Sequence, residues 1–539
     1  MSSLSPKTTA LTRRQAAHLL RRTTFGPSRQ QVDAFTGLSV EEALEQLLQT
    51  PSTSPAPPIQ PGHSTSWLTD FNNPYSSAQL VILRFYLRRW WAAQMIQCDT
   101  ITEKMVLFLH SHFTVKSSKV LFSTLLYHQN ELFRQYSLGN FKKLTKKICT
   151  DTAMSYFLDN YANTAEQPNE NLGRELLELY TIGKGAQVGL GDYTTYTDND
   201  ILEAAKVLTG HVISDIANNN LDPETGLLIT RVAPDLHDTS DKLFSNRFQN
   251  TVIQGRSGKA GVMQELDELL AMIFGQEATA RNIVRKLYRY FCYYKIDDDI
   301  EQNIITPLTQ TFINQDFELL PVLKQLLEST HFYDEDDLTQ SNNIIGAMVK
   351  SPMDVSAGTA RFFNWVLPDM MGQTNHFYEV GEYLEGYAVA GGMELFNPPG
   401  TAGWPAFHQA PHFQRNWISS STMVNRYHFA KVVFIDGIEL PDGSKKRTDS
   451  VAWIDNPANI SDAFDPNVIV KEMTDYMFPA GADETRRNIL KQHLVETLDD
   501  IYWTEAWADY KGGGADDTVR VRLNALFSSL LQSPEYQLG

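Results

Sequence analysis

Cysteine is scarce in this 539-residue chain, and its three copies, Cys98, Cys149 and Cys292, stand far apart. They make neither a zinc-binding spacing nor an evident disulfide framework, so we expect them to pack in the core. Long apolar runs are also missing, since none approaches the roughly 20 residues that a helix needs to cross a bilayer. Excess positive charge is missing too. The net charge of -18 argues against nucleic acid as a partner, because nucleic-acid-binding proteins present a basic face.

Familiar catalytic and nucleotide-binding motifs are absent as well. The chain has no Walker loop, no dinucleotide-binding glycine fingerprint, no Gly-x-Ser-x-Gly elbow and no His-Glu-x-x-His motif. The N-terminus also lacks the apolar stretch of about 7–15 residues that marks a secretion signal. As written, the chain is expected in the cytoplasm. If a signal has been removed, the periplasm or the cell surface is expected instead.

Helical periodicity dominates what is present. Apolar residues make up 42% of the chain and recur at helical spacing along most of it. We expect a mainly α protein, a large multi-helix body with a small β-hairpin insertion near residues 225–255. The segment 76–97 is apolar almost all round and is expected deep in the body. The expected regions are a helical segment (1–50), a proline-rich connector (51–75), a helical core (76–215), a β-rich insertion (216–260) and a C-terminal helical region (261–539).

Two histidines, His110 and His112, end an apolar helical run in the stretch LFLHSHFTV. Residues two apart on an α-helix differ by about 200° in direction and face away from each other. The pair therefore shares a target only if the helix ends between them, and the following Phe-Thr-Val suggests such an end. An extended His-x-His can place both rings on one side and begin a metal site. The alternative is that His110 packs inside and His112 bonds a backbone carbonyl.

The segment 169–183 predicts an acidic helix. Glu175 and Glu178 are three residues apart and share a face, while Arg174 and Glu178 are four apart and can pair. Glu175 lies beside the apolar stripe, which makes it the best candidate for an inward carboxylate. Two acids at this spacing can bind a hard metal or act as an acid–base pair. The alternative is a surface helix with ordinary ion pairs.

Two loops add further candidates. His237 and Asp238 stand together in a loop, and a carboxylate beside an imidazole is the usual way to orient a metal-binding histidine. The alternative is that Asp238 caps a turn and His237 is partly exposed.

The loop at 396–420 is rich in Trp and Pro and carries His408 and His412. It either walls a cleft or covers the core.

Several short segments, taken in order, resemble one bacterial family. They include HSHFTV at 110–115, NENLGRELLELYTIG at 169–183, HDTSDKLF at 237–244, VRKLYRYF at 284–291, KSPMD at 350–354 and NPPGTAGWP at 397–405. The resemblance runs over nearly the whole chain and is to the family called domain of unknown function 1800. It implies a mostly helical protein of unestablished activity that is often exported. It also implies a partner, because genes of the family often neighbour one for a sulfatase-like protein.

Two functions follow as hypotheses. In the first, the chain is a metal-dependent, hydrolase-like enzyme that holds Zn²⁺, Mn²⁺ or Fe²⁺ between helices through His110, His112, Glu178 and His237. Glu175 and Asp238 would then be catalytic, and Arg174 would bind an anionic group. In the second, the chain is a non-catalytic binding or assembly protein that partners a sulfatase-like protein or a surface polymer. The same polar residues would then form a buried network that fixes the packing.

Overall fold

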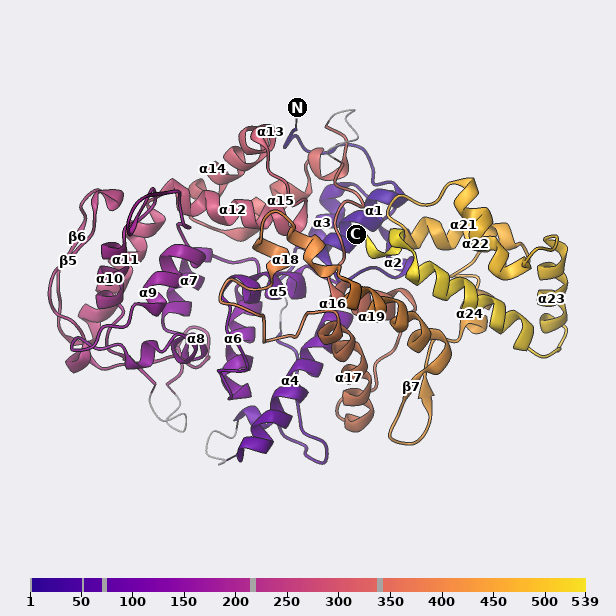
Figure 1. The fold of residues 1–539 in the computed structure, drawn as a ribbon, viewed down its shortest axis with the longest axis horizontal. Helices are drawn as coiled ribbons and strands as arrows, with labels where there is room; N and C mark the ends of the chain where they lie inside the picture. The colour runs from indigo at the N-terminus through magenta and orange to yellow at the C-terminus, as the bar shows by residue number, and fades with distance from the viewer. Residues whose placement is uncertain (1, 51–52, 70–74, 214–219, 337–342) are drawn as a thin grey trace.

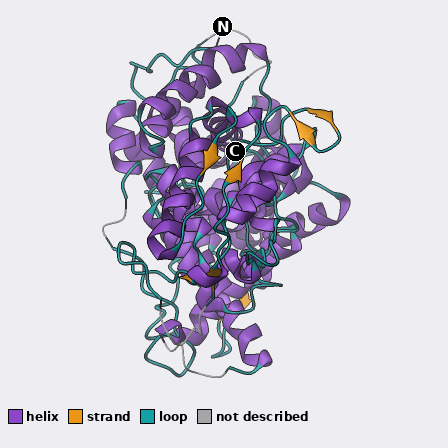
Figure 2. Cartoon of the chain, turned by 90° about the vertical axis from the view of Figure 1, so that its left-hand side faces the viewer, coloured by secondary structure: helices purple, strands orange, loops and turns teal. Residues whose placement is uncertain are grey.

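The computed structural model describes residues 2–50, 53–69, 75–213, 220–336 and 343–539. Within these ranges the chain is mainly α-helical, as the sequence predicts (Figures 1 and 2). Parts of the predicted connector (51–75) and of the predicted β-rich insertion (216–260) lie outside the described residues. The strands of the described residues form antiparallel pairs: β1 (Gln187–Gly189) with β2 (Asp192–Tyr193), β3 (His211–Val212) with β4 (Arg231–Val232), β5 (Lys242–Leu243) with β6 (Val252–Ile253), and β7 (Ile438–Glu439) with β8 (Lys445–Lys446).

Three short helices begin the chain: α1 (Arg13–Thr23), α2 (Arg29–Phe35) and α3 (Val40–Leu47). Each starts at a capping box, in which a Ser or Thr side chain and the residue three positions later satisfy each other's backbone N–H groups. α1 packs against α2 and against α21 (Pro466–Met477), which lies far along the sequence (Figure 1). The N-terminal segment therefore belongs to the same body as the C-terminal helices.

The middle of the molecule is built from α4 (Ser77–Gln97), α5 (Thr102–His112), α6 (Ser123–Gln135), α16 (Pro352–Phe362) and α17 (Thr374–Ala390). α4 packs against α17 and α16, and α5 packs against α6. Trp90 and Trp91 of α4 are fully buried, but Val81 and Ile82 in its first turns are 40% and 46% exposed. The expectation that the whole helix lies deep is therefore wrong for its N-terminal part, where Phe85 is also exposed.

One end of the elongated molecule holds α7 (Phe141–Cys149), α8 (Thr152–Phe157), α9 (Asn171–Glu175), α10 (Asp198–Val207) and α11 (Gly258–Phe274), as Figure 1 shows. Beside them in the chain follow α12 (Glu277–Phe291), α13 (Asp298–Ile300), α14 (Thr306–Asn314) and α15 (Leu319–Leu327). α12 packs against α14, α15 and α11. It also contacts α18 (Pro405–His408), which lies in the loop at 396–420. This last contact brings the loop to the region of the candidate site.

The chain continues with α19 (Ser420–Lys431) and α20 (Ser450–Asp455). The other end of the molecule holds α21, α22 (Glu484–Val495), α23 (Ile501–Lys511) and α24 (Asp517–Gln532), as Figure 1 shows. Most buried apolar side chains from Leu11 to Tyr536 form one continuous core. Burial of apolar surface on this scale is the main favourable contribution to folding. Among the described residues, no helix combines the length and the apolar character that crossing a membrane demands.

Candidate functional site

α5 carries both histidines of the stretch LFLHSHFTV and ends at the second one. The helix runs from Thr102 to His112, and Phe113 is its C-terminal cap. The helix therefore does not end between the two histidines, as a shared target would require. Because helical residues two apart point in nearly opposite directions, His110 and His112 face different surroundings. The expectation of an extended His-x-His is wrong.

His110 is enclosed by aromatic rings. Its ring centroid lies 5.3 Å from that of Trp91, 5.4 Å from that of Phe396 and 5.8 Å from that of Trp404. Burial lowers the pKa of His110 to about 3, so its imidazole is neutral at physiological pH. Its Nε2 has no hydrogen-bond partner among the described residues. The geometry is that of a packed ring in the core.

His112 uses both ring nitrogens in contacts with its neighbours. Its Nε2 lies 3.0 Å from the Tyr180 carbonyl oxygen, which can only accept, so Nε2 carries the proton. The unprotonated Nδ1 then accepts a hydrogen bond from Lys286 Nζ at 3.2 Å. Burial and the neighbouring charge of Lys286 hold the pKa of His112 well below its ordinary value. His112 thus bonds a backbone carbonyl, which is the alternative that the sequence left open.

A π-helical segment explains why His112 and Lys286 meet. α9 changes into a π-helix over Leu176–Tyr180, and the carbonyls at its end lack partners within the helix. Three side chains supply the missing donors. Lys286 Nζ donates to Leu179 O at 2.6 Å, His112 Nε2 donates to Tyr180 O, and Asn282 Nδ2 donates to Thr181 O at 2.7 Å. Asn282 and Lys286 are four residues apart on α12 and share a face.

The segment borders a cavity of about 290 Å³. Its lining includes His112, Glu178, Lys184, Arg281, Arg285, Lys286 and His408. Burial, followed by the charge of Arg289, lowers the pKa of the Lys286 amine to about 7. Lys286 was not among the candidate site residues predicted from the sequence, because its place in the site depends on α12 packing beside the π-helical segment. A five-residue π-helix is itself a common mark of functional sites.

The acidic helix does not form the pairs that ideal α-helical spacing predicts. Glu178 accepts hydrogen bonds from Lys184 Nζ at 3.1 Å and from the Tyr196 hydroxyl at 3.0 Å. Arg174 pairs instead with Glu170 at 2.9 Å, and both side chains are 42% exposed. The predicted Arg174–Glu178 pair is replaced because the helix widens after residue 175 and shifts the directions of the following residues. Arg174 therefore lies at the surface and is not among the residues that line the cavity.

Glu175 is the inward carboxylate of this helix. Burial and the neighbouring Glu178 raise the pKa of Glu175 to about 7, while a hydrogen bond with Thr401 works against the rise. Thr401 belongs to the loop at 396–420, and the next residue, Ala402, lines the cavity. The carboxyl of Glu175 therefore stands between the acidic helix and that loop.

The loop at 396–420 both covers the core and walls the cavity. Trp404 and Trp417 are buried, and Phe407 packs on Tyr290 of α12 with ring centroids 5.1 Å apart. His408 lines the cavity, and burial together with the charge of Lys286 lowers its pKa. His412 is exposed. Of the two histidines, only His408 reaches this site.

His237 belongs to a separate buried group, and the partly buried Asp238 lies next to it. His237 Nε2 lies 3.2 Å from Glu265 Oε2, and Lys242 Nζ lies 2.5 Å from the same oxygen. The side chains of His237, Lys242 and Glu265 are fully buried. Asp238 accepts a hydrogen bond from the Ser240 backbone N–H at 2.8 Å, as expected of a turn-capping aspartate. None of these residues lines the cavity beside Lys286.

The predicted metal ligands are thus distributed over three places. His110 lies in an aromatic cage, His112 and Glu178 line the cavity, and His237 lies in the buried group with Glu265. Within the described ranges, no group of three or more His, Cys, Asp or Glu side chains is placed to hold a metal ion. His112 also has no ring nitrogen left for a cation and has an amine beside it. These four residues therefore do not form one site that fits a divalent metal. Binding of Zn²⁺, Mn²⁺ or Fe²⁺ elsewhere in the protein stays a prediction.

Comparison with protein families matches residues 18–538 to the family described as "Protein of unknown function (DUF1800)". The match covers nearly the whole chain, and the protein belongs to this family. No curated protein and no solved structure matches the chain. The sequence resemblance to this family is therefore confirmed, and its functional implications rest on the site itself.

Proposed function

We propose that this member of the family is an enzyme in which the Lys286 amine acts as a general base on an anionic substrate held beside the π-helical segment. The observation that carries the proposal is the position of the amine. It lines the cavity, and its two hydrogen-bond partners, Leu179 O and His112 Nδ1, are both acceptors. A neutral amine has two N–H groups, which these acceptors engage. Its lone pair then takes the remaining tetrahedral direction.

The protonation state supports this role. Because burial and Arg289 bring the pKa of Lys286 to about 7, a large fraction of the amine is neutral at physiological pH. A base with a pKa near the working pH combines a sufficient neutral fraction with sufficient basicity. Lys286 would take the proton of a water molecule or a substrate hydroxyl and become an ammonium. Its third N–H would then replace the lone pair, with the bonds to Leu179 and His112 retained.

The charge around the cavity favours an anionic substrate. Lys184, Arg281 and Arg285 line it together with Lys286, against the single lining carboxylate of Glu178. Arg281 and Arg285 both bond Glu301, at 2.8 Å and 2.7 Å, so their positions are fixed. Fixed arginines recognise carboxylate and phosphate groups well, because the guanidinium presents its donors in a rigid plane. A hydrolase-like reaction on an anionic ester fits this arrangement.

The amine can be tested without knowledge of the substrate. Competitive acetylation by a trace of isotope-labelled acetic anhydride, read by mass spectrometry over a range of pH, reports the neutral fraction of each lysine. We expect Lys286 to reach half of its maximal reactivity near pH 7. Lys295, whose side chain is 63% exposed, is the internal control. Half-maximal reactivity of Lys286 above pH 9 would contradict the proposal.

Turnover provides the second test. We expect slow hydrolysis of an anionic ester such as p-nitrophenyl phosphate, with a rate that rises through pH 7, and its loss in Lys286→Met. Arg174→Met, which removes a surface cation outside the cavity, is the matched control. Hydrolysis that persists in Lys286→Met would rule out the amine as the base. The non-catalytic role with a sulfatase-like protein or a surface polymer, implied by the family resemblance, stays a prediction.

A further inference from the structure

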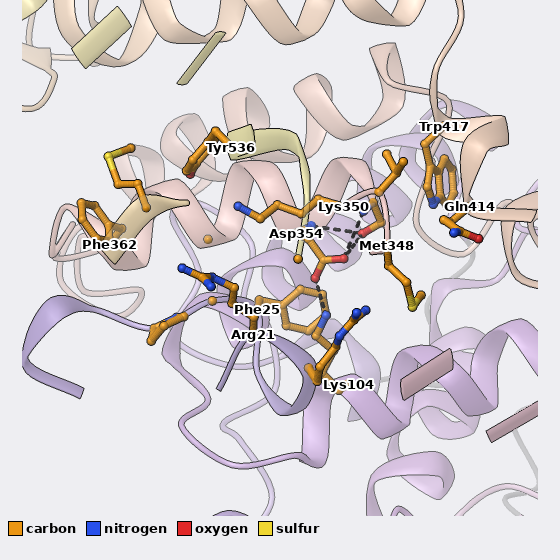
Figure 3. Close-up of a pocket in the computed structure, with 18 of the residues that line it drawn as sticks. Arg21, Phe25, Lys104, Met348, Lys350, Asp354, Phe362, Gln414, Trp417 and Tyr536 are labelled. Atoms are coloured by element: carbon orange, nitrogen blue, oxygen red, sulfur yellow. Dashed lines mark hydrogen bonds and ion pairs between the residues drawn. The ribbon is translucent and has the colours of Figure 1, made fainter. Parts of the chain in front are cut away.

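A second cavity lies on the other side of the aromatic pair Tyr290 and Phe407, which line both cavities. Its volume is about 70 Å³. α1, the segment 348–351 and the start of α16 contribute to its lining, and Figure 3 shows the side chains that gather there. The stretch KSPMD, one of the segments that carry the family resemblance, forms one edge of it. The proposed function makes no use of this cavity.

Positive charge dominates the lining. Four basic side chains, Arg21, Arg22, Lys104 and Lys350, face one aspartate, Asp354. The two arginines and Lys104 are 9%, 7% and 6% exposed, so each is buried. Burial lowers the pKa of Arg21 and of Arg22 to about 10, which leaves both charged at physiological pH. The cavity is therefore cationic and largely withdrawn from solvent.

The one carboxylate is already engaged. Asp354 forms an ion pair with Lys104, as the dashed lines of Figure 3 indicate. Its second oxygen accepts hydrogen bonds from Ser351 N at 3.1 Å and from Ser351 Oγ at 2.8 Å, which cap α16. Asp354 therefore compensates Lys104 and the start of the helix. It leaves the other three basic side chains, of which Arg21 and Arg22 are charged, without a direct counter-charge.

Those three side chains contact neutral groups. Arg21 donates to Tyr476 O at 2.6 Å, and Arg22 donates to Ile344 O at 3.0 Å. Lys350 Nζ lies 3.8 Å from the centre of the Tyr536 ring, and burial together with the charge of Arg21 holds the pKa of this amine well below its ordinary value. Among the described residues, no aspartate or glutamate forms an ion pair with any of the three. Arg22 Nε is buried and has no hydrogen-bond partner in that part of the chain.

Three buried arginines elsewhere in the described residues have carboxylate partners: Arg88 pairs with Glu394, Arg361 with Asp99, and Arg134 with two glutamates. Arg134 pairs with Glu103 at 2.7 Å and with Glu131 at 2.8 Å. At the cationic cavity the next layer adds charge of the same sign, because Arg426 is 1% exposed and donates to Lys350 O at 2.9 Å. Asp334 offsets part of the Arg22 charge from a greater distance. An ion buried without a partner costs several kcal/mol, so such a cluster calls for an anion.

We propose that this cavity binds a tetrahedral oxyanion, phosphate or sulfate, either free or as an ester group of a small molecule. Arginine and lysine nitrogens around a dry cavity are the standard recognition groups for such oxygens. The N-terminus of α16 adds backbone dipoles of the favourable sign. The small volume suits one such group and excludes a larger ligand held entirely inside. The site is separate from Lys286, and the proposal stands whether or not Lys286 is a base.

The test is binding of inorganic phosphate, sulfate and glycerol phosphate to the full chain. Thermal unfolding at matched ionic strength, with chloride as the reference, and ³¹P NMR of the phosphate ligands provide two readouts. We expect saturable stabilisation by phosphate or sulfate beyond that by chloride. Binding of glycerol phosphate as tight as that of phosphate would identify an ester group as the ligand. Binding of inorganic anions alone would identify a free ion. Absence of saturable binding to all three would overturn the proposal.

Variants distinguish specific oxyanion binding in this cavity from a non-specific effect of the protein's charge. Lys350→Met should weaken oxyanion binding about tenfold, the loss expected for one charge-assisted contact. It should also raise the melting temperature of the anion-free protein, because burial holds the pKa of the Lys350 amine well below its ordinary value and this costs stability at neutral pH. A purely structural lysine would lower that temperature. Lys286→Met, in the other cavity, is the control and should bind as the wild type does. Equal anion affinity in Lys350→Met and wild type would refute the proposal, as would weakened binding in Lys286→Met alone.

Discussion

Lys286 Nζ lies 3.2 Å from His112 Nδ1, and this contact joins the C-terminal end of α5 to the middle of α12. The imidazole in turn donates to Tyr180 O at 3.0 Å, so the contact fixes its tautomer. One amine, one imidazole and the end of a π-helical segment thereby form a single unit. The four predictions below test this unit and the three other polar groups that the sequence singled out.

The first prediction concerns the tautomer and pKa of His112. In ¹⁵N-histidine spectra its Nε2 should be protonated and its Nδ1 unprotonated. The charge of Lys286 helps to lower the pKa of His112, so Lys286→Met should raise that pKa. Lys184→Met removes another lysine that lines the same cavity and should leave the His112 signals in place. A His112 signal with Nδ1 protonated, or unmoved by Lys286→Met, would contradict the contact.

The second prediction concerns His110 and acid stability. Its pKa is about 3 in the folded protein and about 6.5 when unfolded, so between these values the unfolded chain binds more protons. The contribution of His110 to the free energy of unfolding is therefore fully present above pH 6.5 and is lost as the pH falls toward 3. His110→Phe should therefore reduce the difference in unfolding free energy between pH 7 and pH 5 by about 2 kcal/mol. Urea denaturation at both pH values measures it, with the exposed His63→Phe as control. An unchanged difference would mean that His110 takes up a proton in the folded state.

The third prediction concerns Glu175 and has the opposite sign. Burial and Glu178 raise the pKa of Glu175 to about 7, so the folded state holds its proton more tightly than the unfolded chain. Stability from this carboxyl is present below its unfolded pKa, about 4.3, and is lost as the pH rises through 7. Glu175→Gln should stabilise the protein at pH 8 by about 1–2 kcal/mol, after allowance for its partial exposure, and have little effect at pH 4.

Chemical denaturation at pH 4 and pH 8 checks this result. Glu170→Gln, on the exposed side of the same helix, is the matched control and should show no such pH dependence. Destabilisation of the protein by Glu175→Gln at pH 8 would mean that the charged carboxylate of Glu175 is stabilised by a cation or a hydrogen-bond donor. That outcome would favour the predicted catalytic or metal-binding role of this helix.

The fourth prediction concerns the buried group that includes His237. The Glu265 carboxylate lies within ion-pair distance of both Lys242 and His237, and all three side chains are fully buried. Glu265→Gln should cost about 3–5 kcal/mol of unfolding free energy, because it leaves the buried Lys242 ammonium with only the longer pair to Asp238 at 3.9 Å. The double variant Glu265→Leu with Lys242→Met removes both charges and should recover most of this loss. A double variant as unstable as the single one would show that the charged pair itself is required.

Much of the fold is determined by local sequence. The mainly α class follows from apolar residues at helical spacing, and the amphipathic α7 buries Phe141, Leu144 and Ile148 while its lysines are exposed or half-buried. The capping boxes at Thr12, Ser28 and Ser39 set where the first three helices begin. These features depend on residues a few positions apart, so the sequence alone specifies them. The sequence alone also identified His112, Glu175 and Glu178 as candidate site residues.

Tertiary structure decided which of these residues meet. The continuation of α5 through His112 turned its two histidines to opposite sides, and the π-helical segment broke the expected pairing of Arg174 with Glu178. Lys286 entered the site from α12, more than one hundred residues away from its carbonyl partner Leu179. Likewise, the cations of the second cavity come from α1, α5 and the segment before α16. Contacts between such distant segments depend on how the helices pack together. Local spacing supplies the chemical groups, and the packing determines the site.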